Sequence, residues 1–321
     1  MTVLIKKLRF YVSRSRNRMY VLKLLISCVI AVTIFSTTAA FGQISMGGPP
    51  NEDIKVSIGK NGTAHVVHEV HGNATNAVQV EMISGNLTNF SVTDKFNNSV
   101  QYSTISQNPM AVLLLPTQRS VTLIKYDIPN AVSNDNGVWS WNYYAPSDAI
   151  FTDFYFPKGV DVIWAQDRPV YLGEKAGLRQ IGNGMHLTYI INEPETVQTV
   201  QWQNQTFNVG IKTLSNVGSP VFDQSSKAYA FNIDKPGYVT VIMPKALLWG
   251  PYQATINTNS TLTNLFNDNG TYVWIGMKPA QSGTLQITGT TAIPEFPMFV
   301  PLAIAISAVV VLRFSNRLNF H

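Results

Sequence analysis

One segment of the chain concentrates side chains that can ligate metals. His65-Val66-Val67-His68-Glu69-Val70-His71 contains three of the five histidines and one glutamate, and neutral imidazoles suit copper or zinc. If this segment is a strand, alternation turns His68 away from His65, Glu69 and His71, and six steps of ~3.3 Å separate the outer histidines. Of the candidate Cu/Zn ligands His65, Glu69 and His71, only Glu69 and His71 are close enough on one face to hold one ion together, and such a site would need further ligands from another strand. The alternative is an exposed polar strand face with His68 against the core edge.

A second segment is rich in aromatic residues at strand spacing. Trp139, Trp141 and Tyr143 alternate with polar residues and therefore share one face. This row either packs between two sheets or forms a flat platform on which sugar rings stack. We expect Trp249, which follows Leu247-Leu248, to be a peripheral core residue.

Asparagine glycosylation is the modification that the sequence indicates best. The N-x-[ST] acceptor triplet begins at eight positions, and most of them coincide with turn signals, where a glycan can project into solvent. The eight candidate residues are Asn61, Asn73, Asn86, Asn89, Asn97, Asn204, Asn259 and Asn269.

No catalytic arrangement is evident. The sequence has no G-x-S-x-G, H-E-x-x-H or phosphate-loop motif. Carboxylates such as Glu193 and Glu195 would serve glycoside hydrolysis only if they faced each other across a cleft, and we interpret them as solvated surface groups. The sequence therefore predicts a non-enzymatic protein without a cofactor.

Charge is distributed unevenly along the chain. Nine of the 23 Lys and Arg lie within residues 1–23 and after residue 312, which leaves 14 against 18 acidic residues in residues 43–297, a net of −4. A mildly acidic body without a basic stripe argues against nucleic acid as a partner. The only cysteine, Cys28, lies outside this body, which therefore has no disulfide bond.

Residues 1–42 have the pattern of an export signal. A basic stretch precedes the apolar run from Leu24 to Phe35, and small residues follow up to Ala40 and Gly42. This order is typical of a secretory signal peptide, with an uncleaved signal anchor as the alternative. In both cases the positive residues stay in the cytoplasm and the body is exported, so the membrane and the export machinery are expected partners.

The opposite end has a second apolar segment. Pro294-Glu295-Phe296-Pro297 leads into an uncharged run from Met298 to Leu312, which Arg313 and Arg317 follow. Counted from Phe296, this run would span ~25 Å as a helix, just under the ~30 Å hydrocarbon core. A C-terminal transmembrane anchor with a cytoplasmic basic end is the direct interpretation.

These C-terminal residues resemble a known sorting signal. A P-E-F motif at Pro294, Glu295 and Phe296, then Pro297, an apolar span and a basic end containing Arg313 are similar to the PEF-type signal of archaeal cell-surface proteins. The resemblance implies recognition by an archaeosortase, which removes the tail near the motif and leaves a lipid-anchored protein. Residues 293–321 form this predicted segment.

The body between the two ends has the periodicity of strands. Short alternating runs such as Ile54–Ile58 and Val121–Lys125 are separated by turn signals such as Asn61-Gly62. After a linker at residues 43–53, we expect an all-β fold of two immunoglobulin-like β-sandwich modules, at residues 54–195 and 196–292.

The second module also resembles a family. Tyr238–Leu248, Gly250-Pro251-Tyr252 and Gly289-Thr290-Thr291 are similar to a β-domain common just before PEF-type signals, which implies a structural or display module. The sequence as a whole predicts an exported cell-surface protein for display, adhesion or envelope structure. Its expected partners are other envelope proteins or glycans. Binding of a carbohydrate or peptide on the aromatic row and binding of metal at the histidines are the alternatives.

Overall fold

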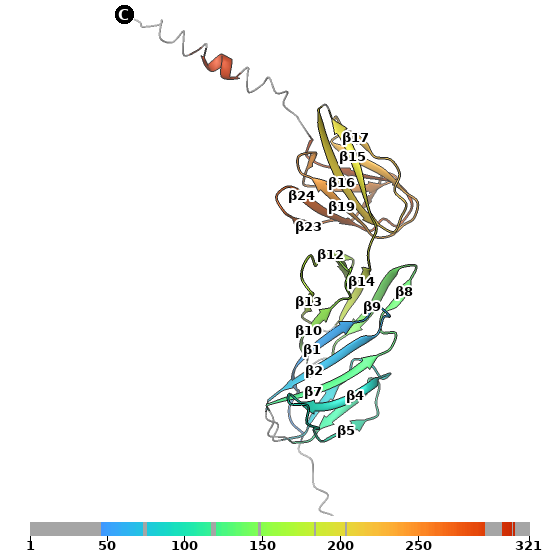
Figure 1. Cartoon of the computed structure of the whole chain (residues 1–321), viewed down its shortest axis with the longest axis vertical. Coiled ribbons are helices and arrows are strands. Elements are labelled where there is room, and N and C mark those ends of the chain that lie inside the picture. The colour runs from blue at the N-terminus through green and yellow to red at the C-terminus, as the bar shows by residue number, and fades with distance from the viewer. Residues whose placement is uncertain are drawn as a thin grey trace, which may run out of the picture.

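The structure is a computed structural model that describes residues 46–72, 76–116, 120–146, 149–182, 184–202, 204–292, 304–309 and 311, with the backbone alone at 149 and 150. Twenty-six strands make up nearly all of its regular structure, and the predicted all-β fold is confirmed. The strands group into two units that follow one another along the long axis of the molecule (Figure 1). We call β1–β14 module 1 and β15–β26 module 2.

Module 1 contains three sheets. A six-stranded sheet has the order β13-β10-β1-β2-β7-β4, a five-stranded sheet β12-β11-β14-β9-β8, and a small sheet β3-β6-β5. The strands are β1 (Asn51–Ile58), β2 (Ala64–His71), β3 (Val78–Glu81), β4 (Thr88–Asp94), β5 (Tyr102–Ile105), β6 (Ala111–Leu114), β7 (Val121–Ile128), β8 (Ser133–Asp135), β9 (Val138–Tyr144), β10 (Ala149–Tyr155), β11 (Val162–Ala165), β12 (Arg168–Tyr171), β13 (Gly177–Gln180) and β14 (Gly184–Ile190).

Alternation in the sequence explains how these sheets pack. In β1 the side chains of Ile54, Val56 and Ile58 are buried, and the intervening side chains face outward. The same alternation in β2 and β7 gives the six-stranded sheet one apolar face and one polar face. The apolar face joins side chains of the other two sheets in one continuous core. Burial of this shared face is the main stabilising contribution to module 1.

The predicted Asn61-Gly62 turn connects β1 to β2, and its backbone geometry requires glycine at position 62. Gly62 has a φ of +80°, which L side chains rarely adopt, and a Cβ there would lie 2.3 Å from the carbonyl oxygen of Val132. The amide of Val132 in turn donates to the oxygen of Gly62 over 3.0 Å. This close approach links the hairpin to the segment before β8.

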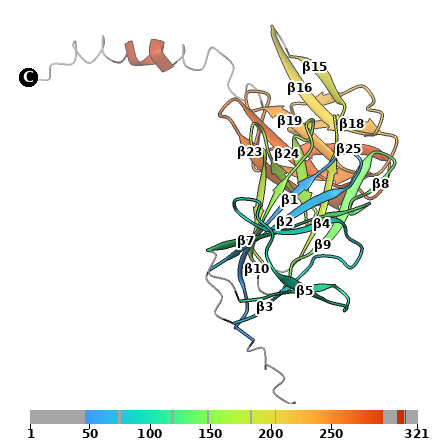
Figure 2. The ribbon, with the colours of Figure 1, turned by 60° about the horizontal axis from the view of Figure 1, so that its bottom comes forward.

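Module 2 consists of two five-stranded sheets and one short pair. Their orders are β15-β16-β19-β24-β23, β17-β18-β25-β21-β22 and β20-β26, with a second core composed of side chains from these sheets. The β15–β16 hairpin extends beyond the rest of the module (Figure 2). The strands are β15 (Glu195–Trp202), β16 (Gln205–Thr213), β17 (Val221–Asp223), β18 (Ala228–Ile233), β19 (Val239–Pro244), β20 (Leu248–Trp249), β21 (Gln253–Ile256), β22 (Asn259–Thr261), β23 (Thr263–Asp268), β24 (Tyr272–Met277), β25 (Gly283–Thr288) and β26 (Thr291–Ala292).

Both predicted boundaries of module 1, at residues 54 and 195, differ slightly from the ends of its strands. β1 begins at Asn51, inside the predicted linker, because Asn51 pairs with His71 at the end of the β1–β2 ladder. At the other edge, Glu195 is the first residue of β15 and pairs with Lys212 of β16. Glu195 therefore belongs to module 2, and residues 191–194 connect the modules.

The terminal segments fall largely outside the described residues. The predicted signal peptide and Pro294, Glu295, Phe296, Pro297 and Arg313 are not among them. Residues 304–309 and 311 are helical. Within the described part of the chain, no helix combines the length and apolarity needed to cross a bilayer.

Candidate functional site

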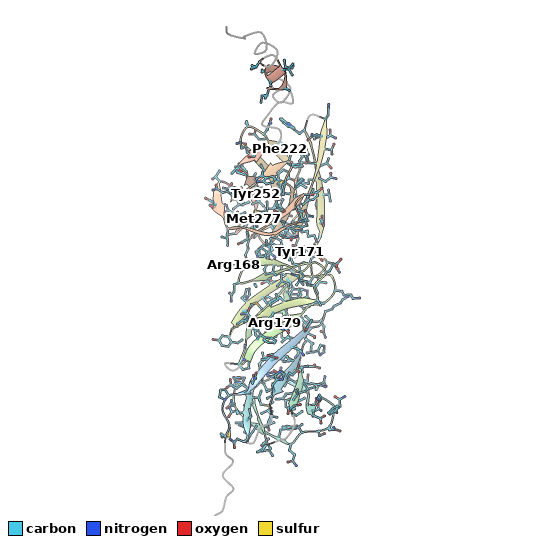
Figure 3. All side chains as sticks on the ribbon, turned by 90° about the vertical axis from the view of Figure 1, so that its left-hand side faces the viewer. Arg168, Tyr171, Arg179, Phe222, Tyr252 and Met277 are labelled. Atoms are coloured by element: carbon cyan, nitrogen blue, oxygen red, sulfur yellow. The ribbon has the colours of Figure 1, made fainter. Side chains whose placement is uncertain are left out.

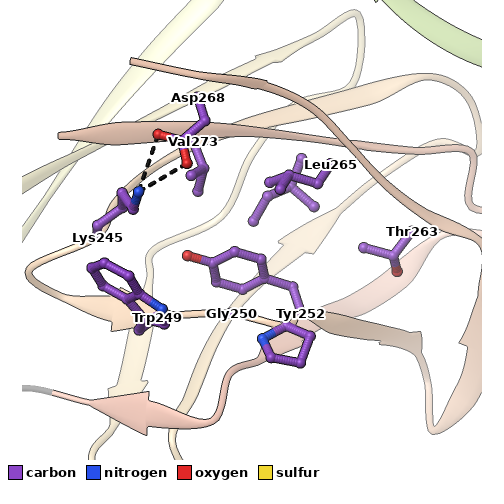
Figure 4. A pocket seen from close by; sticks show the side chains of 10 residues that line it. Lys245, Trp249, Gly250, Tyr252, Thr263, Leu265, Asp268 and Val273 are labelled. Carbon is purple, nitrogen blue, oxygen red and sulfur yellow. Dashed lines mark hydrogen bonds and ion pairs between the residues drawn. The ribbon is translucent and has the colours of Figure 1, made fainter. Parts of the chain in front are cut away.

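Module 2 contains a concavity that is lined by described residues. It is a half-open pocket of about 330 Å³ between β20–β21 and β23–β24 (Figure 4). Its lining residues are Lys245, Trp249, Gly250, Pro251, Tyr252, Thr263, Leu265, Asp268, Val273 and Ile275. We call it the Trp249 pocket.

Local strand geometry turns Trp249 toward solvent. The preceding Leu248 is fully buried in the core of module 2, so alternation along β20 directs the next side chain outward. β20 is fixed in this orientation by its backbone pairing with β26. In addition, the Thr290 amide donates a 2.8 Å hydrogen bond to the carbonyl oxygen of Trp249. The indole is consequently 51% exposed, and the expectation that Trp249 is a peripheral core residue is wrong.

A charged pair stands beside this indole. Nζ of Lys245 donates to both carboxylate oxygens of Asp268, over 2.8 and 3.1 Å, and lies 4.6 Å from the centre of the Trp249 ring. The hydrogen bond from Lys245 lowers the pKa of Asp268, assisted by the amide of Gly270. Asp268 is therefore ionised at neutral pH, and the ammonium group of Lys245 offsets its negative charge.

The remaining walls are aromatic and aliphatic. Tyr252 donates its hydroxyl to the Leu248 oxygen over 2.8 Å, which fixes the ring, and burial raises its pKa to about 12. Val273 and Ile275 are buried, whereas Leu265 is 57% exposed. The pocket thus combines an apolar surface with one polar edge.

The second feature is the interface between the two modules, which we call the junction. Its apolar cluster contains Val162, Trp164 and Ile190 of module 1 and Tyr238 of module 2. The rings of Trp164 and Tyr238 lie 4.7 Å apart, and Pro169 lies so close to Gly276 that a Cβ there would be 2.5 Å from its ring. Tyr171 of the same β11–β12 hairpin lies where the modules meet, with Met277 in the adjoining module (Figure 3).

Polar contacts surround the apolar part of the junction. Asp167 accepts hydrogen bonds from the Tyr238 hydroxyl and from Nζ of Lys278, and the bond from Lys278 is the main cause of its lowered pKa. On the other side, Nζ of Lys212 lies 2.5 Å from Oδ2 of Asp161.

Glu193 lies beside that second ion pair. Its Oε1 is buried without a hydrogen-bond partner in the described part of the chain. Burial raises its pKa to about 7, although the charge of Lys212 acts in the opposite direction. The interpretation of Glu193 as a solvated surface carboxylate is therefore wrong, whereas Glu195 is exposed.

A buried polar triad also lies in module 1. Nδ1 of His68 lies 2.8 Å from Oε2 of Glu52, and Nε2 of His68 lies 2.7 Å from the hydroxyl of Tyr126. The same hydroxyl accepts a hydrogen bond from the backbone amide of Ile83. Each of these contacts joins a donor to an acceptor when His68 donates through Nδ1 and accepts at Nε2. Glu52 and His68 have no exposed surface, so this triad cannot touch a substrate and is interpreted as core structure.

The three candidate metal ligands bind different partners. His65 pairs with Asp127 at 2.6 Å, Glu69 with Lys55 at 2.7 Å, and His71 with Asp53 at 3.1 Å. The side chains that the structure describes include no group of three His, Cys, Asp or Glu residues arranged to hold a metal ion. The predicted alternation is confirmed, because His68 is buried on the opposite face.

The aromatic row faces the core of module 1. Tyr143 is 1% exposed, Trp141 packs edge-on against Tyr143 and Phe154, and Trp139 stacks on Tyr189. The geometry therefore favours the packing interpretation, and the sugar-platform alternative for this row is not supported, because its flat faces contact other side chains.

Seven of the eight sequon asparagines lie in the described part of the chain, and all seven are exposed: Asn61, Asn86, Asn89, Asn97, Asn204, Asn259 and Asn269. Asn73 lies outside it. Asn89 differs from the others because its Nδ2, the atom that a glycan would modify, donates to Asp127 over 2.6 Å.

Comparisons with known proteins give no family. No family model and no curated protein matches the chain. Two solved structures from Bacteroides ovatus match in part: a multidomain protein including DUF1735, and a structural genomics protein of unknown function. In each case the match has 10% sequence identity, covers 76% of this chain and 92% of the other, and has a TM-score of 0.17.

Proposed function

We propose that the protein is a non-enzymatic, exported cell-surface scaffold, anchored at its C-terminus, whose two immunoglobulin-like modules form a rigid rod for display in the cell envelope. The junction is the observation that carries this proposal. A scaffold has to hold its modules in a fixed line, and the default for two domains on a short connection is relative motion unless the interface is substantial and apolar.

The junction has the composition that such rigidity requires. Trp164 and Tyr238 are almost completely buried against each other, and Asp167 connects two module 2 side chains to the β11–β12 hairpin. Bending the rod would expose these rings and leave polar groups without partners, which costs free energy on both counts.

Two further features are consistent with display outside the cell. The sequon asparagines of the described part are exposed in both modules, as glycan acceptors on an envelope protein would have to be. The body has no cysteine, so its two cores supply its stability without disulfide bonds.

Protease shaving of intact cells tests the proposal. Trypsin added outside should cleave the body while a cytoplasmic marker stays intact, and the mass of the native protein should show the processed N-terminus, the C-terminal anchor and any glycans. Cleavage only after the cells are permeabilised would overturn the proposal, provided that the wall admits trypsin.

A further inference from the structure

The Trp249 pocket has a feature that the proposed scaffold does not use. A rod needs no half-exposed tryptophan in a concavity, and large aromatic side chains are normally well buried. Here Trp249 is 51% exposed and the adjoining Leu265 is 57% exposed. Both side chains line the same pocket of about 330 Å³. That volume is at the lower end of small-molecule sites, ~300–1,000 Å³.

The lining identifies the chemical class of the ligand. Trp249, Tyr252 and Leu265 offer apolar surface, and the Lys245–Asp268 pair forms one polar edge (Figure 4). A pyranose ring has the same division, because one face carries C–H groups and its edge carries hydroxyls. Since the two charges cancel, the pocket has no excess charge with which to select an anionic or cationic ligand.

Hydrogen-bonding capacity remains at the polar edge. Oδ1 of Asp268 accepts from Lys245 and from the amide of Gly270, whereas Oδ2 accepts from Lys245. A carboxylate oxygen has two lone pairs and an ammonium group three protons. One hydroxyl can therefore donate to Oδ2 while its neighbour accepts from Nζ, an arrangement that matches two adjacent sugar hydroxyls.

We propose that the Trp249 pocket binds a neutral saccharide, with one or two sugar rings against Trp249 and Tyr252 and adjacent hydroxyls on Asp268 and Lys245. This goes beyond the scaffold function, since it gives module 2 a specific ligand. A peptide is disfavoured because it would present its own backbone polar groups to the apolar floor of Val273 and Ile275.

The saccharide has two sources with the same chemistry. One is a glycan of another envelope molecule. The other is a glycan on Asn269 of this chain, because this exposed sequon directly follows Asp268. A glycan on Asn269 that filled the pocket would block added sugar, and the variant Asn269→Gln would restore binding.

The test uses the full chain, purified in detergent, on an array of neutral oligosaccharides and acidic controls, followed by titration of the best neutral one. We expect binding by the wild type or by Asn269→Gln, an at least tenfold loss in Trp249→Ala, and a smaller loss in Asp268→Asn. Tyr144→Ala serves as the matched control, because Tyr144 is 75% exposed in module 1. Its affinity should not change. Circular dichroism and thermal melting establish that each variant is folded.

Three results would overturn the proposal: no neutral saccharide bound by either folded protein, equal affinity in Trp249→Ala, or Trp249-dependent binding of a peptide instead. Because binding is measured on purified protein, these results are independent of where the protein resides. A failed shaving experiment with intact sugar binding would refute only the scaffold's surface location.

Discussion

The hydroxyl of Tyr238 donates a hydrogen bond to Oδ1 of Asp167 over 3.1 Å, and this bond joins the two modules. Asp167 lies in the turn between β11 and β12, where both it and Gln166 have positive φ, of 59° and 52°. A turn of two such residues is the one that matches strand twist in a tight hairpin, although glycine and asparagine occupy it more easily. The strained turn therefore presents the carboxylate to module 2.

Asp167→Ala should destabilise the junction. It removes the acceptor of both Tyr238 and Lys278. We expect a loss of about 1 kcal/mol in the free energy of unfolding, mainly from the buried Tyr238 hydroxyl, because the ion pair with Lys278 is about half exposed. Spin labels on Ser57→Cys and Thr196→Cys, in a Cys28→Ser background, should also report a broader distance distribution between the modules.

Asp167→Asn is the matched variant for this experiment. Asparagine tolerates positive φ and keeps an acceptor for Tyr238, so its distance distribution should remain narrow. An equally narrow distribution in Asp167→Ala would contradict the role of this residue in holding the rod straight.

Glu193 predicts an unusual pH dependence of stability. Burial raises its pKa from an ordinary value of 4.5 to about 7, so between these values the folded state binds the proton that the unfolded state has lost. Glu193 therefore contributes its full share to the free energy of unfolding below pH 4.5. This contribution is lost as the pH rises to 7, at about 1.4 kcal/mol per pH unit. The lowered pKa values of Asp167 and Asp268 act in the opposite direction, but only at lower pH.

Glu193→Gln should therefore make the protein more stable at pH 8 and nearly unchanged at pH 4.5. Urea denaturation at half-unit pH steps measures this, and the neutral amide should flatten the slope between pH 4.5 and 7. Glu195→Gln, at an exposed neighbour, should keep the wild-type slope. A wild-type slope in Glu193→Gln would show that another group titrates in this range.

Alternation predicted the strands that have one buried face and one exposed face. In module 1, the alternating runs Ile54–Ile58 and Val121–Lys125 lie in β1 and β7, which contribute to the core. The strands that the sequence did not indicate, such as β17 and β22, are edge strands of three residues each, and neither has a buried side chain. Their extended backbone depends on pairing with a neighbour, and that pairing is not encoded in local periodicity.

The candidate site was harder to predict for a related reason. Trp249 follows two leucines, a sequence context that suggests the core, and only the pairing of β20 with β26 decides which of the three faces outward. Glu193 stands between Asn192 and Pro194, a typical surface turn, yet its Oε1 is buried near Lys212 of module 2 and Asp161 of module 1. Long-range contacts therefore determined both functional environments.

The buried triad of module 1 predicts a difference between two substitutions of one residue. Glu52→Ala removes the acceptor of His68 Nδ1 and leaves that donor without a partner in a closed core, which should cost about 1–3 kcal/mol. Glu52→Gln keeps an acceptor at nearly the same volume and should cost much less. Urea denaturation measures both values. Similar losses would indicate that the negative charge of Glu52 stabilises this site, because glutamine keeps the volume and an acceptor but not the charge.

The geometry of the sequons predicts unequal glycan occupancy. Transfer of a glycan to asparagine needs a free Nδ2, and at Asn89 this atom donates to Asp127 within β4, where the register with β7 is irregular. Asn204 and Asn269, by contrast, lie in exposed connections between strands. Peptide mass spectrometry of the native protein should find higher occupancy at Asn204 and Asn269 than at Asn89.

Asp127→Ala, which releases the Asn89 amide, should raise occupancy at Asn89 alone if transfer follows folding. High occupancy at Asn89 in the wild type would mean that the glycan is added before this hydrogen bond forms.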